Sequence, residues 1–316
     1  MSEYQTEYQV DFDKISNLIF EITNKASNEA DYIMKVDYQK ILYLLKKKLD
    51  EESEIKNHLQ FYWYKHGPYS TPVANEVSNS FRRGVLDLVE LEQGNAFTLN
   101  KDCLKQRSKN SIEDETKETL SDIIKEYDFY EDRDKIFRMI YEDAPYEFQK
   151  FYRLEFYPIF DNIQSGFSLF TNPQYGKERL IEYLIIAEAK LPTDEEFEEF
   201  NSFFSRYSTL SSMMIENLDD DLYMESLDYL TDIGKEMWKV FCYKLRILEH
   251  DPYYESKVDE WENKYQNSLK PLAEKIGNLD SFVSNNIERN REFSFKEVRS
   301  SEDSPWGEIT KELIQN

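Results

Sequence analysis

The stretch that decides the fold runs from Val36 to Ser70 and reads VDYQKILYLLKKKLDEESEIKNHLQFYWYKHGPYS. Its first part carries apolar side chains at spacings of three and four residues, as on the buried face of an amphipathic helix. These side chains are Tyr38, Ile41, Leu42, Leu45 and Leu49. Its last part is an aromatic block that ends at Gly67-Pro68, where proline fixes φ and disfavours helix in the residue before it. The stretch therefore predicts a helix followed by an aromatic turn.

A second helix and a pair of strands are predicted to follow. Ser70 or Thr71 can cap this helix, Pro72 fits its first turn because an N–H is not needed there, and Gly84 ends it. Residues 85–99 then resemble two short strands of a hairpin around Gln93-Gly94-Asn95. Helix, helix, hairpin is the order of a winged helix-turn-helix, so we expect a small winged-helix-like domain in residues 1–110.

The rest of the chain is predicted to be helical. Two long apolar stripes, in residues 222–248 and 258–283, should form an antiparallel helical hairpin. Beyond residue 285 the pattern becomes polar. The expected fold class is therefore mainly α: a winged-helix-like domain with a short β-hairpin, an all-helical domain (111–285) that ends in the long antiparallel hairpin, and a polar C-terminal tail (286–316).

Charge is distributed unevenly between these parts. The net charge of the 316-residue chain is −24. Residues 1–110 carry 17 acidic and 15 basic side chains, whereas residues 111–316 carry 46 and 24. An acidic surface repels phosphate and attracts basic protein surfaces. We therefore expect the acidic helical domain to bind a partner protein with a basic surface.

The composition also indicates a compartment. Cys103 and Cys242 fall in different expected domains, which argues against a disulfide framework and suits a reducing environment. Residues 1–10 are polar and acidic, unlike a secretory signal, and no apolar run is long enough to cross a bilayer. We expect a soluble, cytoplasmic protein that does not bind membranes.

Two short motifs of this sequence resemble a known family. The first is Gln39-Lys40-Ile41-Leu42-Tyr43-Leu44, and the second is Tyr64-Lys65-His66-Gly67-Pro68-Tyr69-Ser70. In this order they resemble the Panacea (SocA-like antitoxin) domain and its relatives, which show a "QKLLY"-type helix and a later "yGP" turn. Here Tyr-Ser follows the Gly-Pro, where valine is more usual. The resemblance covers residues 11–102 and implies neutralisation of a partner protein in a toxin–antitoxin or antiviral-defence locus, with no catalytic residues to carry over.

The aromatic turn is the candidate partner-binding site. Aromatic side chains on a rigid Gly-Pro turn lose little conformational entropy when a partner binds. The candidate residues are Tyr62, Tyr64, His66, Tyr69 and Ser70. The competing interpretation, which the sequence favours for the block as a whole, is that these aromatics are core that holds the turn. In that case Trp63 lies inside and Tyr69 is the more exposed member.

A winged-helix DNA-binding regulator is the first alternative function. The basic side chains that could contact phosphates are Lys46, Lys47, Lys48, Arg82 and Arg83. Five solvated charges outside a basic domain are weak support for nucleic-acid binding.

A metal-dependent nuclease is the second alternative. Residues 183–187 followed by Glu188-Ala189-Lys190 match the apolar strand and E-x-K motif of a restriction-type nuclease, in which Glu188 would hold a metal and Lys190 would stabilise charge. The same residues suit a buried helix, and the absence of flanking strands favours the helix.

The sequence shows no other catalytic constellation. Its glycines do not form a phosphate-binding loop, and His58, His66 and His250 are too far apart in sequence to suggest a metal site. We therefore expect no catalytic residues, no metal and no cofactor. The leading hypothesis is a non-enzymatic, antitoxin-like or defence-associated interaction protein.

Overall fold

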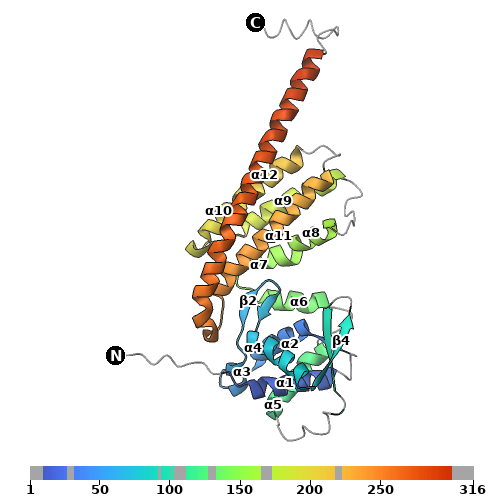
Figure 1. Ribbon diagram of the computed structural model, residues 1–316, viewed down its shortest axis with the longest axis vertical. Helices are drawn as coiled ribbons and strands as arrows, with labels where there is room; N and C mark the ends of the chain where they lie inside the picture. The colour runs from blue at the N-terminus through green and yellow to red at the C-terminus, as the bar shows by residue number, and fades with distance from the viewer. Residues whose placement is uncertain are drawn as a thin grey trace, which may run out of the picture. The chain divides into compact units, whose positions relative to one another are not determined.

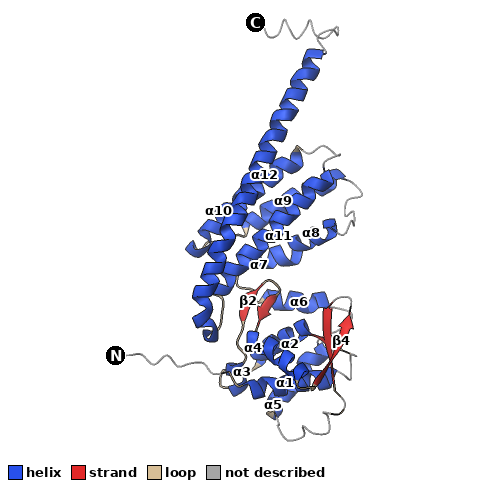
Figure 2. Cartoon of the chain, viewed as in Figure 1, coloured by secondary structure: helices blue, strands red, loops and turns tan. Residues whose placement is uncertain are grey.

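The computed structural model describes residues 10–26, 32–91, 94–100, 102, 112–126, 133–164, 173–217 and 223–300. Its contacts divide the chain into two compact units. One, here called the N-terminal unit, comprises Met1–Lys150 and Phe241–Tyr265; the other, the helical unit, comprises Phe151–Val240 and Gln266–Asn316. The chain is mainly helical, as the sequence predicts, and short strands lie in the N-terminal unit (Figures 1 and 2).

Four helices build the core of the N-terminal unit. They are α1 (Phe12–Ala26), α2 (Lys35–Lys48), α4 (Thr71–Arg82) and α5 (Asp114–Glu126). Both α1 and α2 pack against α4 and against α5. The hydroxyl of Tyr38 on α2 lies 2.7 Å from Thr23 Oγ1 on α1, inside this core. The unit also contains α3 (Glu54–His58), α6 (Arg133–Glu142), the start of α7 (Glu147–Phe151) and the 3₁₀ helix η5 (Pro252–Lys257).

The contacts divide the chain differently from the boundary expected at residue 110. Helices α5 and α6 belong to the N-terminal unit, although they follow that boundary in sequence. Residues Phe241–Tyr265 join the same unit from far along the chain.

The two strands predicted in residues 85–99 form, although Gly94 and Asn95, which the sequence assigns to the turn, are the first residues of the second strand. A strand that the sequence did not predict extends this pair. Strands β4 (Leu86–Leu91) and β5 (Gly94–Leu99) pair antiparallel, with Leu88 opposite Phe97. Strand β1 (Ile33–Met34) adds to the other edge of β5. A strand of two residues is too short to show the alternation by which strands are recognised.

The aromatic turn is a second, smaller hairpin rather than a simple turn. Strands β2 (Tyr62–Tyr64) and β3 (Gly67–Tyr69) pair antiparallel, with Trp63 opposite Pro68. The cap predicted for the next helix is confirmed, because the Ser70 side chain accepts a hydrogen bond of 3.3 Å from the N–H of Val73 at the start of α4. Gly84, with φ +70°, follows the end of α4, also as predicted.

The helical unit is built around aromatic side chains. Its helices are α8 (Tyr157–Gln164), α9 (Pro173–Ala189), the 3₁₀ helix η3 (Glu195–Phe197), α10 (Glu198–Glu216) and parts of α11 (Tyr223–Leu248) and α12 (Val258–Ser300). The ring of Tyr152 stacks on that of Trp238 at 5.5 Å, and its hydroxyl donates to the carbonyl of Gly234 over 2.7 Å. A Cβ at Gly234 would lie 2.4 Å from the ring of Phe160, so this close approach requires glycine.

One segment of the helical unit departs from α-helical geometry. Between α7 and α8, residues Tyr152–Phe156 form a π-helix, labelled η2. Pro158, the second residue of α8, lacks the N–H that would bond to the fourth residue before it. The wider π-turn thus lies next to a proline, which commonly disturbs helical hydrogen bonding.

Helices α11 and α12 contact each other in each unit. Lys244 Nζ lies 3.7 Å from Glu262 Oε2 in the N-terminal unit, and the Tyr229 hydroxyl donates to the carbonyl of Lys275 over 3.2 Å in the helical unit. Helix α12 continues to Ser300, beyond residue 285 where the apolar stripe fades, and residues 301–316 of the expected tail lie outside the described residues. None of the described helices is both long and apolar enough to cross a membrane.

Candidate functional site

The helix motif and the turn motif meet in space. Gln39 on α2 makes two hydrogen bonds to the backbone of Ser70: its Oε1 accepts from the N–H over 2.7 Å, and its Nε2 donates to the carbonyl over 3.0 Å. The ammonium of Lys40 donates to the carbonyl of His66 on the other side of the turn. Gly67 has φ +92°, a conformation that L side chains rarely adopt. Adjacent residues of one helix thus hold both ends of the Gly-Pro turn.

The aromatic block is divided between core and surface. Trp63 is buried, as predicted, and its ring lies 6.0 Å from that of Tyr43 and 5.7 Å from that of Tyr141. Of the candidate partner-binding residues, Tyr62 and Ser70 are buried, Tyr64 and Tyr69 are half-buried and His66 is exposed. Tyr69 is more exposed than Tyr62, as expected, but its ring still lies 5.7 Å from that of Tyr62.

A distant part of the chain covers this block. Residues Glu249–Tyr254, here called the corner segment, connect α11 to α12. The N–H of Trp63 donates to the carbonyl of Glu249 over 2.9 Å, and the N–H of Asp251 donates to the carbonyl of Phe61 over 2.8 Å. These bonds form an antiparallel bridge between Tyr62 and His250, so the corner segment extends the β2–β3 hairpin at the edge of β2.

Two side chains of the corner segment make specific polar contacts. The carboxylate of Asp251 accepts hydrogen bonds from the Lys46 ammonium and from the Phe61 N–H. The Tyr254 hydroxyl accepts from the N–H of Thr71 over 2.9 Å and donates to the carbonyl of Gln60 over 3.1 Å. Burial raises the pKa of Tyr254 above its ordinary value, so this hydroxyl stays a donor.

Rings of the corner segment and of the residues on either side of it pack over the block. The ring of Tyr62 lies 4.8 Å from those of both Tyr254 and Trp261. The guanidinium of Arg246 lies 5.3 Å from the ring centroid of Tyr64, 4.7 Å from that of Tyr243 and 5.2 Å from that of Trp261. These three distances are within the range of cation–π contacts.

The guanidinium of Arg246 has no complete set of hydrogen-bond acceptors. Its Nε and Nη2 atoms are buried without a partner among the described residues. Burial lowers the pKa of Arg246, because the charged form loses its hydration.

Sequence reasoning missed this half of the site. Tyr243, Arg246 and Trp261 are about 180 to 200 residues from the block that they cover, and between them the sequence shows only turn residues at His250-Asp251-Pro252. Helical periodicity assigns these side chains to a buried face without showing which surface the face meets.

Four of the five basic candidates for phosphate binding pair with acidic side chains. Lys46 pairs with Asp251, Lys47 Nζ lies 3.7 Å from Asp143, Lys48 Nζ lies 3.0 Å from Glu126, and Arg83 pairs with the buried Glu76. Arg82 is exposed at the end of α4. Pairing with carboxylates reduces the positive charge that a phosphate would meet at these positions.

The E-x-K motif lies on a helix. Residues 183–187, which a nuclease core would require as a strand, belong to α9, together with Glu188 and Ala189, and Lys190 follows the helix end. The helix that the sequence favours is therefore confirmed, but the expectation that it is buried is not, because Ile185 is 58% exposed and only Leu184 and Ala187 of residues 183–187 are buried. Among the described residues, no group of three or more His, Cys, Asp or Glu side chains is arranged to hold a metal ion.

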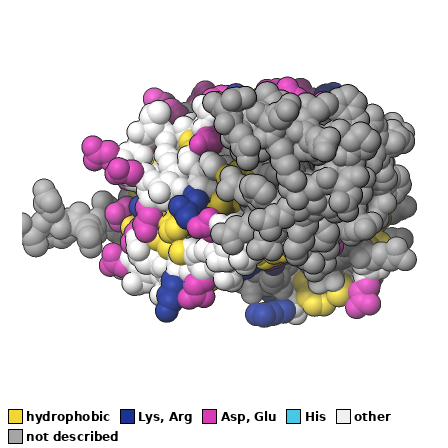
Figure 3. All heavy atoms as spheres, turned by 90° about the horizontal axis from the view of Figure 1, so that it is seen from above, with side chains coloured by type: hydrophobic (Ala, Val, Ile, Leu, Met, Phe, Trp, Pro, Cys, Tyr) yellow, Lys and Arg dark blue, Asp and Glu magenta, His cyan; other side chains and the backbone are white. Residues whose placement is uncertain are grey.

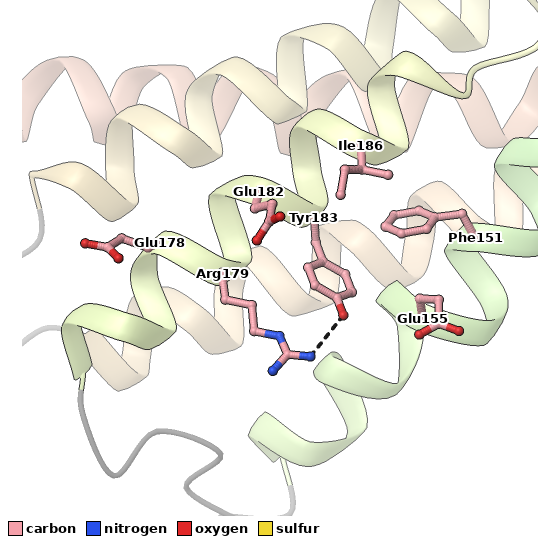
Figure 4. A pocket seen from close by; sticks show the side chains of 7 residues that line it. All are labelled: Phe151, Glu155, Glu178, Arg179, Glu182, Tyr183 and Ile186. Carbon is pink, nitrogen blue, oxygen red and sulfur yellow. Dashed lines mark hydrogen bonds between the residues drawn. The ribbon is translucent and has the colours of Figure 1, made fainter.

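The helical unit contains an acidic pocket. Its volume is about 470 Å³, and it is lined by Phe151, Glu155, Glu178, Arg179, Glu182, Tyr183 and Ile186. Figure 4 shows Phe151 and Glu155 on one helical segment and the other five residues on α9. Acidic side chains also occur across the described part of the face seen in Figure 3, with a few Lys and Arg among them.

The pocket is lined by three Glu side chains and a single Arg side chain. Arg179 Nη2 donates to the Tyr183 hydroxyl over 3.1 Å, and the guanidinium lies 5.4 Å from the Tyr183 ring centroid. The ring of Phe151 lies 5.5 Å from that of Tyr183. Three Glu side chains with one Arg and two aromatic rings suit a cationic side chain, whose charge faces the carboxylates while its stem packs on the rings.

Comparison of the chain with models of known protein families, with curated proteins and with solved structures gives no match.

Proposed function

We propose that this chain is a non-enzymatic interaction protein that binds and controls a partner protein through the partner's basic surface. The observation that carries the proposal is the acidic pocket of the helical unit, which fits a Lys or Arg side chain. The net charge of −24 supports it, because a negative chain attracts a basic partner over distances beyond direct contact.

The class of the partner follows from the two motifs. Their resemblance to the Panacea domain suggests an antitoxin or a component of a phage-defence locus, and hence a toxin or a defence subunit as the partner. The contacts of Gln39 and Lys40 with the Gly-Pro turn support this resemblance, because they give both motifs one structural role. In this proposal the N-terminal unit is winged-helix-like with β4–β5 as its wing, α11 and α12 form the antiparallel hairpin, and the protein acts in the cytoplasm.

A binding experiment with a basic probe tests the pocket. We expect the full chain to bind a fluorescein-labelled peptide of alternating Arg and Gly, measured by anisotropy. The double variant Glu155→Gln, Glu182→Gln should bind the peptide about tenfold more weakly, a loss of ~1.4 kcal/mol. The matched variant Glu198→Gln, Glu199→Gln removes two exposed carboxylates from α10 of the same unit and should bind like the wild type.

Two outcomes would count against the pocket. Equal weakening by both double variants would show that overall charge, and not the pocket, attracts the peptide. If neither double variant weakens binding of the peptide, the site for a basic partner lies elsewhere. Repeating the titration at high salt separates long-range attraction, which is screened, from contacts inside the pocket.

The DNA-binding alternative has less support from the geometry, because four of its five basic residues already pair with carboxylates. An electrophoretic mobility assay at two salt concentrations tests it, since binding to phosphates weakens steeply with salt. The nuclease alternative requires Glu188, so DNA cleavage that survives Glu188→Ala would remove that motif from consideration.

A further inference from the structure

The edge of β2 has the features of a peptide-binding groove. An extended segment that pairs with an exposed strand gains affinity from main-chain hydrogen bonds and specificity from side-chain contacts. The corner segment makes both kinds of contact. Its main chain bonds to Phe61 and Trp63, and its side chains Asp251 and Tyr254 reach polar groups beyond the strand.

The side-chain contacts define what the groove recognises. The Lys46 ammonium and the Phe61 N–H together require a negatively charged acceptor, which Asp251 supplies. Three residues later, the groove presents the N–H of Thr71 and the carbonyl of Gln60 to one hydroxyl group, and Tyr62 offers a ring against which a second ring packs at 4.8 Å. A tyrosine satisfies all three requirements.

The contact between the corner segment and the groove also has unfavourable terms. Besides Arg246 Nε and Nη2, the buried atoms His250 Nδ1 and Gln60 Oε1 have no hydrogen-bond partner among the described residues. A buried polar atom without a partner is less stable than the same atom hydrogen-bonded to water. Opening of the groove would let these atoms bond to water. This hydration would offset part of the free energy that is lost when the strand contacts break.

We propose that this groove is a second protein-binding site, held closed by the corner segment, and that it accepts a segment of a partner protein that is extended up to a carboxylate and then turns into a 3₁₀ helix, with a tyrosine three residues after the carboxylate. The proposal is independent of the acidic pocket, since the groove belongs to the N-terminal unit. A tethered segment competes with any free ligand. The apparent affinity for a partner therefore equals the affinity of the open groove multiplied by the fraction of molecules in which the groove is open.

The test measures binding of the corner segment's own sequence in trans to the full chain. The probe is a fluorescent peptide with the sequence of residues 247–255, ILEHDPYYE. In the variant Asp251→Ala, Tyr254→Ala the corner segment loses its two side-chain contacts while every groove residue is retained. We expect this variant to bind the peptide at least about tenfold more tightly than the wild type, as for a groove that is open in one molecule of ten or fewer.

Two controls make the result specific. Asp259→Ala removes an exposed carboxylate from the start of α12 and should bind the peptide like the wild type. A peptide in which Ala replaces the aspartate and Phe replaces the second tyrosine should bind the double variant about tenfold more weakly. If the folded double variant binds the native peptide no better than the wild type does, or binds both peptides equally, the proposal is wrong.

A milder variant is used if the double variant fails to fold. Asp251→Asn keeps the shape of the side chain and removes its charge. Hydrogen exchange should then accelerate at the amides of Trp63 and Asp251, whose bonds join the groove to the corner segment, but not at Ala74 in α4. Unchanged exchange at Trp63 and Asp251, or equal acceleration at all three amides, would overturn the proposal.

Discussion

Arg246 lies 4.7–5.3 Å from the ring centroids of Tyr64, Tyr243 and Trp261, yet two of its nitrogen atoms have no acceptor within the described residues. Its cation–π contacts are stabilising, at about 0.5–2 kcal/mol each. The desolvated, unpaired nitrogens oppose them with a cost of similar size. The net contribution of Arg246 to folding is therefore small, although its contacts are numerous.

Replacing Arg246 by methionine tests this balance. Methionine keeps most of the side-chain volume against the three rings and removes the buried charge. We expect the free energy of unfolding, measured by urea titration, to change by less than about 1 kcal/mol, because substitution of a buried charge by a well-packed apolar side chain is often neutral or stabilising. A loss above ~2 kcal/mol would show that the guanidinium is a net anchor.

The hairpin of β2 and β3 depends on α2 for its shape. Two short strands are marginal on their own in water. Here Gln39 and Lys40 bind the backbone on both sides of Gly67-Pro68, and the corner segment adds a further strand contact. The shape of the turn thus depends on contacts with residues far away in sequence, and the local Gly-Pro motif only indicates where the turn lies.

Substitution of two glycines separates local strain from this tertiary contact. Both Gly67 and Gly84 have positive φ, so alanine at either position costs about 1–2 kcal/mol. A Cβ at Gly67 would also lie 2.7 Å from Lys40 Nζ, whereas one at Gly84 meets nothing within 4 Å. We expect Gly67→Ala to lose about 1–3 kcal/mol more than Gly84→Ala, because the bond from Lys40 to His66 must shift.

The measurement is a chemical denaturation curve for each variant. Equal losses would mean that Lys40 moves aside without cost. In that case the bond from Lys40 to His66 would not contribute to stability.

Helix α9 shows that the neighbouring elements determine whether an apolar segment forms a helix or a strand. Residues 183–187 are apolar enough for a buried strand, but a strand requires a partner for its backbone groups, whereas a helix bonds its own. α9 packs against α10 and η2, with Leu184 and Ala187 buried and Ile185 58% exposed. The absence of flanking strands was therefore the informative feature of the sequence.

At the scale of the whole molecule, many tyrosines are buried in both units. Burial raises the pKa values of Tyr38, Tyr43 and Tyr254 in the N-terminal unit and of Tyr207 in the helical unit. Each of these hydroxyls resists ionisation in the folded chain, whereas in the unfolded chain it ionises near pH 10.

Stability should consequently fall as pH rises above about 10. Above that pH the unfolded chain has released protons that the folded chain retains, so the free energy of unfolding decreases with pH. Below pH 10 both states keep these protons, and the four tyrosines contribute no pH dependence. Urea titrations between pH 9 and 11, with tyrosinate absorbance at 295 nm as the second readout, check this expectation. Full tyrosinate absorbance in a chain that is still folded would contradict it.

The sequence by itself determined the local structure of this protein. Helical periodicity predicted α2 and the helical character of residues after 110, and local chemistry predicted the cap at the start of α4, its end at Gly84 and two strands in residues 85–99. These features depend on interactions between residues close in sequence, which a single chain displays directly.

Only the tertiary structure decided which surfaces meet. It placed residues 241–265 with the N-terminal unit, covered Tyr62 with Tyr254 and Trp261, and paired Lys46 with Asp251. It also formed the acidic pocket from Glu155 and the Glu residues of α9. Such contacts join residues far apart in the chain, and apolar burial, which drives them, is non-directional. One sequence therefore shows that a face is buried but does not identify the face that covers it.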